Sequence, residues 1–143
     1  MDNIKRQNLL HALKLDGERL ICIAGRPGMD DALKSARAIG CPETVRQLKQ
    51  LAKRRGVPVI YTLQLPHHIE YRKNKRPRLS DLKGGGIHKQ QADAVCLLYR
   101  TGYYTPLEQP QEAEIIIAQN KHGSRGTALL KWQASFAKFS ELP

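Results

Sequence analysis

The residues of this sequence best suited to chemistry are the cations gathered between positions 66 and 91. Lysine and arginine side chains neutralise phosphate groups and hold a nucleic-acid backbone without reading its bases. Only Glu70 and Asp81 oppose them in this stretch, hereafter the basic loop (residues 66–91). The cations that we expect to contact phosphates are Arg72, Lys73, Lys75, Arg76, Arg78, Lys83 and Lys89.

Glycines and one aromatic residue add to this interpretation. Gly84 and Gly86 leave room for another chain to approach the backbone closely. Tyr71 supplies a ring on which a base can stack, although a single tyrosine is weak evidence for a stacking surface. The other interpretation is a solvated basic loop that binds nothing in particular, because runs of charge usually face water. Charge alone does not separate the two.

No other constellation of side chains predicts a site for catalysis or metal binding. The histidines at 67–68 with Glu70 have no clear third ligand nearby. The sequence contains no Cys-x-x-Cys pair, so Cys22, Cys41 and Cys96 predict neither a disulfide framework nor a zinc site. Cys22 and Cys96 lie in apolar runs and are expected to be small buried thiols. No pair of a nucleophile and a base emerges.

Net charge says most about partners. The chain of 143 residues is long enough for one core, so we expect a single domain over residues 1–143. A net charge of +11 attracts polyanions, of which nucleic acid is the commonest in the cytosol. No apolar segment approaches the roughly 20 residues that cross a bilayer. No signal-type run follows the N-terminus either, so we expect a cytoplasmic protein with no membrane partner.

Alternating helices and strands must position the basic loop. Apolar periodicity predicts helices over residues 3–14, 30–39 and 42–55. Apolar runs predict strands over 20–24, 57–63, 94–99, 113–118 and 127–132. Helices before strands, followed by a strand-rich final third, indicate an α/β fold with a partly parallel sheet. Near the C-terminus, Trp132, Phe136 and Phe139 are expected to form an apolar patch that closes the core.

Several motifs from Gly56 onward resemble a known family. Leu63-Gln64-Leu65 ends a predicted strand, Arg76-Pro77-Arg78-Leu79-Ser80-Asp81-Leu82-Lys83 lies in the basic loop, and the strand Ala113–Ala118 precedes two glycines. Together they resemble the C-terminal motor domain of the DnaB-type replicative helicases. The resemblance implies a partial RecA-like (P-loop NTPase-type) sandwich with a mixed, mostly parallel sheet and a β-rich C-terminal part.

The resemblance also implies roles for single residues. Gln64 matches the glutamine that senses the nucleotide state, and the motif from Arg76 to Lys83 matches the loop that holds single-stranded DNA in a central channel. Lys121 stands at the position of the family's arginine finger. More faintly, Gly25, Arg26, Pro27 and Gly28 resemble the loop that leads into the phosphate-binding motif. With Gln64 and Lys121 they would form the remnant of a nucleotide site.

The sequence departs from the family where ATP would bind. The family continues with Gly-Lys-Thr or Gly-Lys-Ser, whose lysine bonds phosphate and whose hydroxyl binds magnesium. Here Asp30 and Asp31 follow, and two carboxylates would repel a triphosphate. The family's block with the catalytic glutamate and the magnesium-holding aspartate is missing before helix 42–55. Lys121 keeps a charge but not the planar fork of arginine. Although the family uses ATP and magnesium, we therefore expect neither cofactor.

The DNA-facing loop changes in the opposite direction. Gly84 and Lys89 stand where the family has glutamates, so the loop becomes more basic. This asymmetry predicts a degenerate helicase-like protein of DNA replication or DNA metabolism that binds single-stranded DNA and does not hydrolyse ATP. The alternatives are a protein that packs onto or inhibits a full-length replicative helicase ring, an active helicase fragment, and an inert relic. Homo-oligomers and RNA as a ligand stay open.

Overall fold

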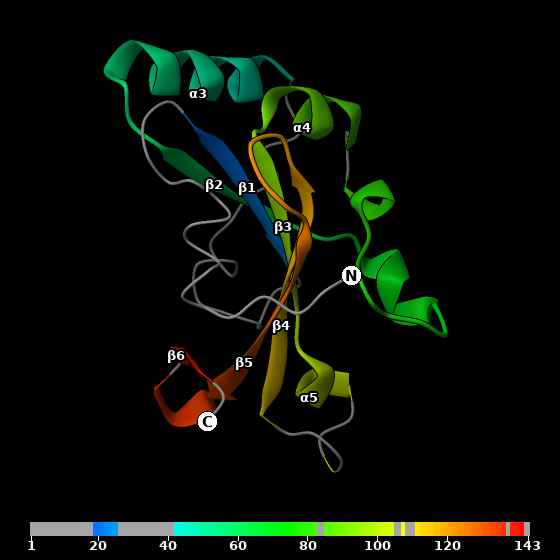
Figure 1. The fold of residues 1–143 in the computed structure, drawn as a ribbon. Coiled ribbons are helices and arrows are strands. Elements are labelled where there is room, and N and C mark those ends of the chain that lie inside the picture. The colour runs from blue at the N-terminus through cyan, green and yellow to red at the C-terminus, as the bar shows by residue number, and fades with distance from the viewer. Residues whose placement is uncertain are drawn as a thin grey trace.

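The strands of this protein form one mixed sheet (Figure 1). The computed structural model describes residues 19–25, 42–82, 85–104, 107, 111–136 and 138–141. Their strands are β1 (Leu20–Gly25), β2 (Val59–Gln64), β3 (Ala94–Tyr99), β4 (Glu112–Asn120), β5 (Gly126–Gln133) and β6 (Lys138–Glu141). The spatial order is β2-β1-β3-β4-β5-β6.

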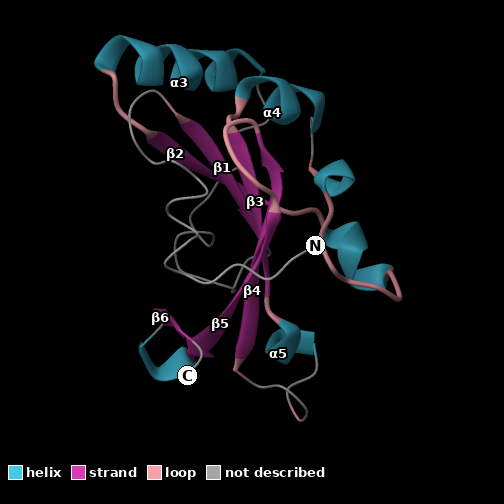
Figure 2. Cartoon of the chain, in the orientation of Figure 1, coloured by secondary structure: helices cyan, strands magenta, loops and turns pink. Residues whose placement is uncertain are grey.

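Helices lie at both ends of these strands, with the two longest described helices together at one end (Figure 2). The α-helices are α3 (Pro42–Arg55), α4 (Gly85–Gln91) and α5 (Thr101–Tyr104). Short 3₁₀ helices are η1 (His67–Tyr71), η2 (Leu79–Asp81) and η3 (Ala134–Phe136). Helices α3 and α4 lie side by side near the start of β1 and β3.

The expected mixed α/β sheet with a strand-rich C-terminal part is confirmed, with one correction. Strand β1 pairs in parallel with β2 and β3, whereas β3-β4, β4-β5 and β5-β6 are antiparallel. The sheet is therefore not mostly parallel. The reason is connection length, because the short turns that link β4, β5 and β6 can join only antiparallel neighbours.

The central strands are apolar on both faces. Leu20, Cys22 and Ala24 of β1 pack into a core with α3, α4 and the basic loop. The alternate residue Ile21 packs with Ala94, in a second cluster that also contains Cys96, Ile117 and Ala128. A strand buried on both faces has a continuous apolar run in place of an alternating pattern. This explains why the run of β3 was visible in the sequence.

Strand β2 is an edge of the described sheet, because it pairs only with β1. Tyr61 and Leu63 face the core, while Ile60 on the opposite face is 53% exposed. The strand begins at Val59, later than the predicted residue 57. Pro58 has no N–H to donate, and the N–H of Val57 instead donates to the Ala52 carbonyl of α3 at 3.3 Å.

Helix α3 has the predicted bounds, Pro42–Arg55. Val45 and Ala52 are fully buried against the sheet, and Glu43 lies in the first turn, where the helix dipole favours a negative charge. The helix ends at Gly56, whose φ is +62°. This left-handed conformation suits glycine because it has no Cβ.

The basic loop is more ordered than its composition predicted. It contains η1, η2 and α4, and the apolar side chains of Ile69, Leu82 and Ile87 pack into the main core. Three apolar residues were too widely spaced to show a period in the sequence. No helix was predicted in this segment, so η1, η2 and α4 are additions to the predicted elements.

At the C-terminal end, β6 was not predicted, because its sequence Lys138-Phe139-Ser140-Glu141 is short and partly charged. The rings of Trp132 and Phe139 are in contact at 4.8 Å between centroids, as expected. Phe136 does not join them, since it is 77% exposed. The helices predicted over 3–14 and 30–39 lie outside the described residues.

Replacing Gly56 by alanine should destabilise the protein by about 1 kcal/mol, because a Cβ strains the left-handed backbone. A Cβ at Gly56 would meet no atom within 4 Å, so any loss comes from the backbone and not from a clash. Gly86 is the matched control, because a Cβ there is also unopposed but the residue is helical with no positive φ. Urea denaturation of Gly86→Ala should show equal or slightly higher stability. Equal losses in both variants would contradict the role given to Gly56.

Candidate nucleic-acid interface

An arginine–aspartate pair shapes the basic loop. Arg72 donates from Nη1 to Asp81 Oδ1 at 2.6 Å and from Nη2 to Asp81 Oδ2 at 2.9 Å. The same guanidinium also donates to the backbone carbonyls of Asn74 and Arg76. Such a two-pronged pair fixes both partners, since the planar fork matches the carboxylate. Arg72, predicted to contact DNA, is thus occupied within the loop.

Asp81 is the buried anchor of this arrangement, with only 4% of its side chain exposed. Its Oδ2 accepts the backbone N–H of Arg78 at 2.8 Å, which caps the start of η2. Burial alone would raise the pKa of Asp81, but hydrogen bonds from Arg72 and from the Arg78 backbone hold that pKa below its usual range. The carboxylate therefore stays charged and keeps the loop closed around it.

Arg76 is the second cation that the fold uses internally. Its guanidinium donates to the carboxylate of Glu114 and, at 3.3 Å, to the hydroxyl of Thr127. It also lies 6.0 Å from the centre of the Tyr99 ring. These partners come from β3, β4 and β5, so Arg76 fastens the basic loop to the sheet. Its charge is largely offset by Glu114.

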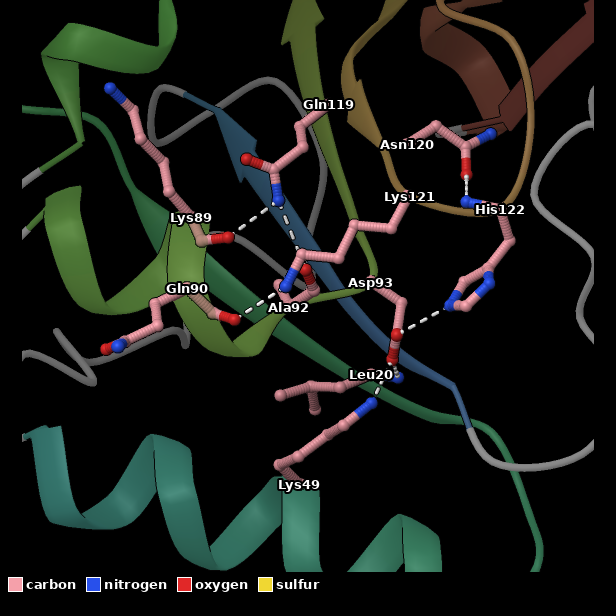
Figure 3. Close-up of polar contacts among 10 residues, drawn as sticks. All are labelled: Leu20, Lys49, Lys89, Gln90, Ala92, Asp93, Gln119, Asn120, Lys121 and His122. Atoms are coloured by element: carbon pink, nitrogen blue, oxygen red, sulfur yellow. Dashed lines mark hydrogen bonds and ion pairs between the residues drawn. The ribbon is translucent and has the colours of Figure 1, made fainter.

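Other cations of the basic loop face solvent. Lys73, Arg78 and Lys89 are exposed. The side chain of Lys89 extends from α4 on the side away from its backbone carbonyl, which accepts a hydrogen bond from Gln119 (Figure 3). Lys75 is intermediate, because its Nζ donates to the carbonyl of Arg72 at 3.1 Å. The loop therefore separates cations that hold the fold from cations that are free to meet phosphates.

The remaining predicted contacts are only partly placed. Lys83 and Gly84 lie outside the described residues. Gly86 is exposed in the first turn of α4. Because a Cβ there would meet nothing within 4 Å, packing inside the protein does not require a glycine at this position.

A pocket lies between the basic loop and the sheet. It has a volume of about 390 Å³. Its lining includes Arg76 and Arg78 from the loop, apolar residues of β3 and β4, and Arg125 from the turn before β5. Sequence reasoning missed Arg125, because a single arginine in a turn has no pattern. It lies seven residues past the strand predicted over 113–118, and this position alone gave no chemical signal.

The proposed nucleotide-site residues are divided between two ends of the sheet. Gly25 and Gln64 are register partners at the carboxyl ends of β1 and β2, so the structure brings them together. Arg26, Pro27 and Gly28 lie outside the described residues. Lys121 follows β4 near the opposite end, about 16 Å away along β1 at the usual rise per strand residue. Lys121 therefore does not share a site with Gly25 and Gln64 in one copy of the chain.

At that opposite end, the turn after β4 is bound to helix α4 (Figure 3). Lys121 donates from Nζ to the carbonyl of Gln90 at 2.5 Å. Gln119 donates to the carbonyls of Lys89 and Ala92 at 2.9 and 3.1 Å. These carbonyls at the end of α4 lack helical partners, so the two side chains act as its C-terminal cap.

Asp93 joins three elements at the same end (Figure 3). Its Oδ2 accepts the Nζ of Lys49 from α3 at 2.5 Å and the backbone N–H of Leu20 at 2.8 Å. Its Oδ1 lies 2.9 Å from Nε2 of His122. Burial alone would raise the pKa of Asp93, but the bonds from Lys49, Leu20 and His122 lower that pKa to about 2. No role for Asp93 was predicted from the sequence.

Other titratable groups are structural. Cys22 and Cys96 are buried free thiols, as predicted, and burial raises the pKa of each to about 12. Cys41 lies outside the described residues. In the described part of the chain, no group of three or more His, Cys, Asp or Glu residues is placed to hold a metal ion. No helix among those residues has the length and apolar character needed to span a membrane.

Replacing Asp93 by asparagine should lower the free energy of unfolding by about 2 kcal/mol at neutral pH. The pKa of Asp93 is lower in the folded chain than in the unfolded chain, so its stabilisation is full above about pH 4 and is lost as pH falls toward 2. Urea denaturation at pH 7 and at about pH 3 measures this, and the stability difference between the two proteins should be roughly halved at the lower pH.

The control for Asp93 is Glu43→Gln, which removes an exposed pair with Arg46 at 3.8 Å and should change stability little. An Asp93→Asn variant as stable as the wild type at neutral pH would show that the Asp93 contacts do not hold the three elements together.

Comparison with known proteins gives a consistent assignment. The model of the DnaB-like helicase C terminal domain matches residues 29–141. The chain is 36% identical over 140 residues to the replicative DNA helicase DnaC of Bacillus subtilis (strain 168), covering 97% of this chain and 30% of that protein. It is 41% identical over 101 residues to a probable replicative DNA helicase of Trieres chinensis, covering 68% of this chain and 22% of that protein.

Solved structures agree with the sequence relatives. The ATPase domain of G40P superposes with a TM-score of 0.68 at 30% identity, covering 96% of this chain and 49% of that one. A DnaB-like replicative helicase, described with its interactions with primase, has a TM-score of 0.68 at 31% identity over 96% of this chain and 33% of that one. The chain thus spans about a third of the curated relative that it matches over nearly all of its own length. The mixed sheet, the Arg76-to-Lys83 motif and these matches together show that the chain belongs to the DnaB-like helicase C-terminal domain family.

Proposed function

We propose that this chain acts in DNA replication by binding single-stranded DNA through the exposed cations of its basic loop, without hydrolysing ATP. One observation carries the proposal: the loop separates its cations by role. Arg72 and Arg76 are held by carboxylates inside the fold, whereas Lys73, Arg78 and Lys89 face solvent. A loop that was merely solvated would not need an internal framework to hold its free cations in position.

The chemistry of these cations fits the backbone of a nucleic acid better than its bases. Exposed lysines act as point charges toward phosphates, and Arg78 adds a fork that can grip two oxygens. Such contacts position a strand without reading sequence, and their binding weakens as salt rises. Relatives of this chain are replicative DNA helicases, which favours DNA over RNA as the partner.

The sequence supports the second half of the proposal. Asp30 and Asp31 occupy the place where the family has the lysine and hydroxyl that hold phosphate and magnesium. At the described carboxyl ends of β1 and β2 stand Gly25 and Gln64, neither of which can act as a carboxylate ligand for magnesium. Lys121 is bound to the carbonyl of Gln90 at the other end of the sheet.

Replacing Lys73, Arg78 and Lys89 together by alanine should weaken binding of a single-stranded oligonucleotide and make it less sensitive to salt. Loss of three phosphate contacts should flatten the slope of log K against log salt by about 2. Fluorescence anisotropy over a salt series measures both effects. Arg72 and Arg76 are left unchanged, because their removal would disturb the fold of the loop itself.

The matched control replaces Arg46, Lys53 and Arg54 of α3 by alanine. These residues are also exposed, and their replacement removes the same charge. Equal losses in both triple variants would mean that net charge binds the strand, and not the basic loop. Absence of any strand binding by the wild type would favour the alternative partner, a full-length replicative helicase. The edge of β2 that has no strand partner among the described residues, where Ile60 is exposed, would then be the surface to test, by co-elution with such a helicase.

A further inference from the structure

The pocket between the basic loop and the sheet combines cations with an apolar floor. Arg78 contributes from the loop, and Arg125 contributes from the turn between β4 and β5, 47 residues further along the chain. Both residues are exposed. Arg76 also lines the pocket, but Glu114 already offsets its charge. The net positive charge of the pocket therefore comes from two arginines that the fold brings together.

The accessible apolar floor of the pocket is made by Ala118 of β4 and Leu79 of η2, which are both partly exposed. Leu97 of β3 and Ile116 of β4 are core residues buried beneath them. Because Ala118 is two residues from Ile116 along the strand, both side chains point to the same face. An apolar floor of this kind suits the flat face of a nucleic-acid base better than it suits a phosphate or a water cluster.

The size of the pocket limits what enters it. A volume of about 390 Å³ lies near the lower end of the range of roughly 300–1,000 Å³ for small-molecule sites. The pocket thus fits one base with its sugar phosphate and not a longer stretch of strand. An arginine side chain can donate two parallel hydrogen bonds to a phosphate group. Two arginines at the rim of the pocket therefore define where the phosphate lies.

We propose that this pocket takes one nucleotide of the bound strand, with its base against Leu79 and Ala118 and its phosphate between Arg78 and Arg125. The inference rests on the proposed single-strand binding and adds a site where a base, and not only the backbone, contributes affinity. It also assigns a role to Arg125, which lies outside the basic loop. The free nucleotide shares the same chemistry, so the test must separate a strand from a monophosphate.

The first measurement compares a labelled oligo(dT) with a strand of equal length in which the bases are replaced by abasic sites. The wild type should bind the base-containing strand about five to ten times more tightly, since base contacts are lost in the abasic strand. Ala118→Phe fills the floor without changing charge, so it should remove this preference, and the ratio of the affinities for the two strands is the readout. Free thymidine monophosphate should compete only at millimolar concentration.

A second variant keeps the test independent of packing. Arg78→Ala with Arg125→Ala leaves the core intact and should weaken oligo(dT) binding several-fold more than the control Lys53→Ala with Arg54→Ala, which removes the same charge from α3. Equal binding of both strands by the wild type, with equal effects of the two double variants, would overturn the pocket and leave strand binding in place. No binding of either strand would overturn both proposals. Micromolar competition by the monophosphate would assign the pocket to free nucleotide instead.

Discussion

Two buried carboxylates, Asp81 and Asp93, hold together a chain in which basic residues greatly outnumber acidic ones. With 24 lysines and arginines against 13 aspartates and glutamates, the fold must use each buried acid to fix more than one element. Asp81 closes the basic loop around Arg72, and Asp93 joins α3, the start of β1 and the turn after β4. Burying a charge is tolerated only where it is paired and hydrogen-bonded, which both residues satisfy. The cations left over are then presented on the surface.

If the chain binds DNA as proposed, the division of cations explains how such a surface persists without an intact nucleotide site. The framework that shapes the basic loop is internal to the loop and to strands β4 and β5, through Arg72 with Asp81 and Arg76 with Glu114. None of these contacts involves Gly25 or Gln64, at the carboxyl ends of β1 and β2. We therefore expect changes in the phosphate-binding motif to leave the loop undisturbed. Gly84 and Lys89 stand where the resembled family has glutamates, so both changes remove negative charge and fit the same direction.

Much of the fold could be predicted from the sequence, because it depends on local signals. Pro42 and Gly56 mark the bounds of α3, and the apolar run of β3 marks a strand buried on both faces. The site could be predicted only in part. The roles of Arg72 and Arg76 depend on partners brought close by folding, and Glu114 is 38 positions from Arg76. Arg125 gives no local signal. Asp93 does give one, because it is a lone acid between apolar residues, but no role was predicted for it. Strand β6 could not be predicted, because it is short and its sequence is partly charged.

The central claim is that a helicase-like domain binds a single strand without using ATP. The most direct measurement is fluorescence anisotropy of labelled oligo(dT) with the wild-type protein at two salt concentrations, each with and without Mg-ATP. Our account predicts binding that weakens as salt rises and is the same with and without Mg-ATP. Affinity that changes when Mg-ATP is added, or no binding even at low salt, would contradict it.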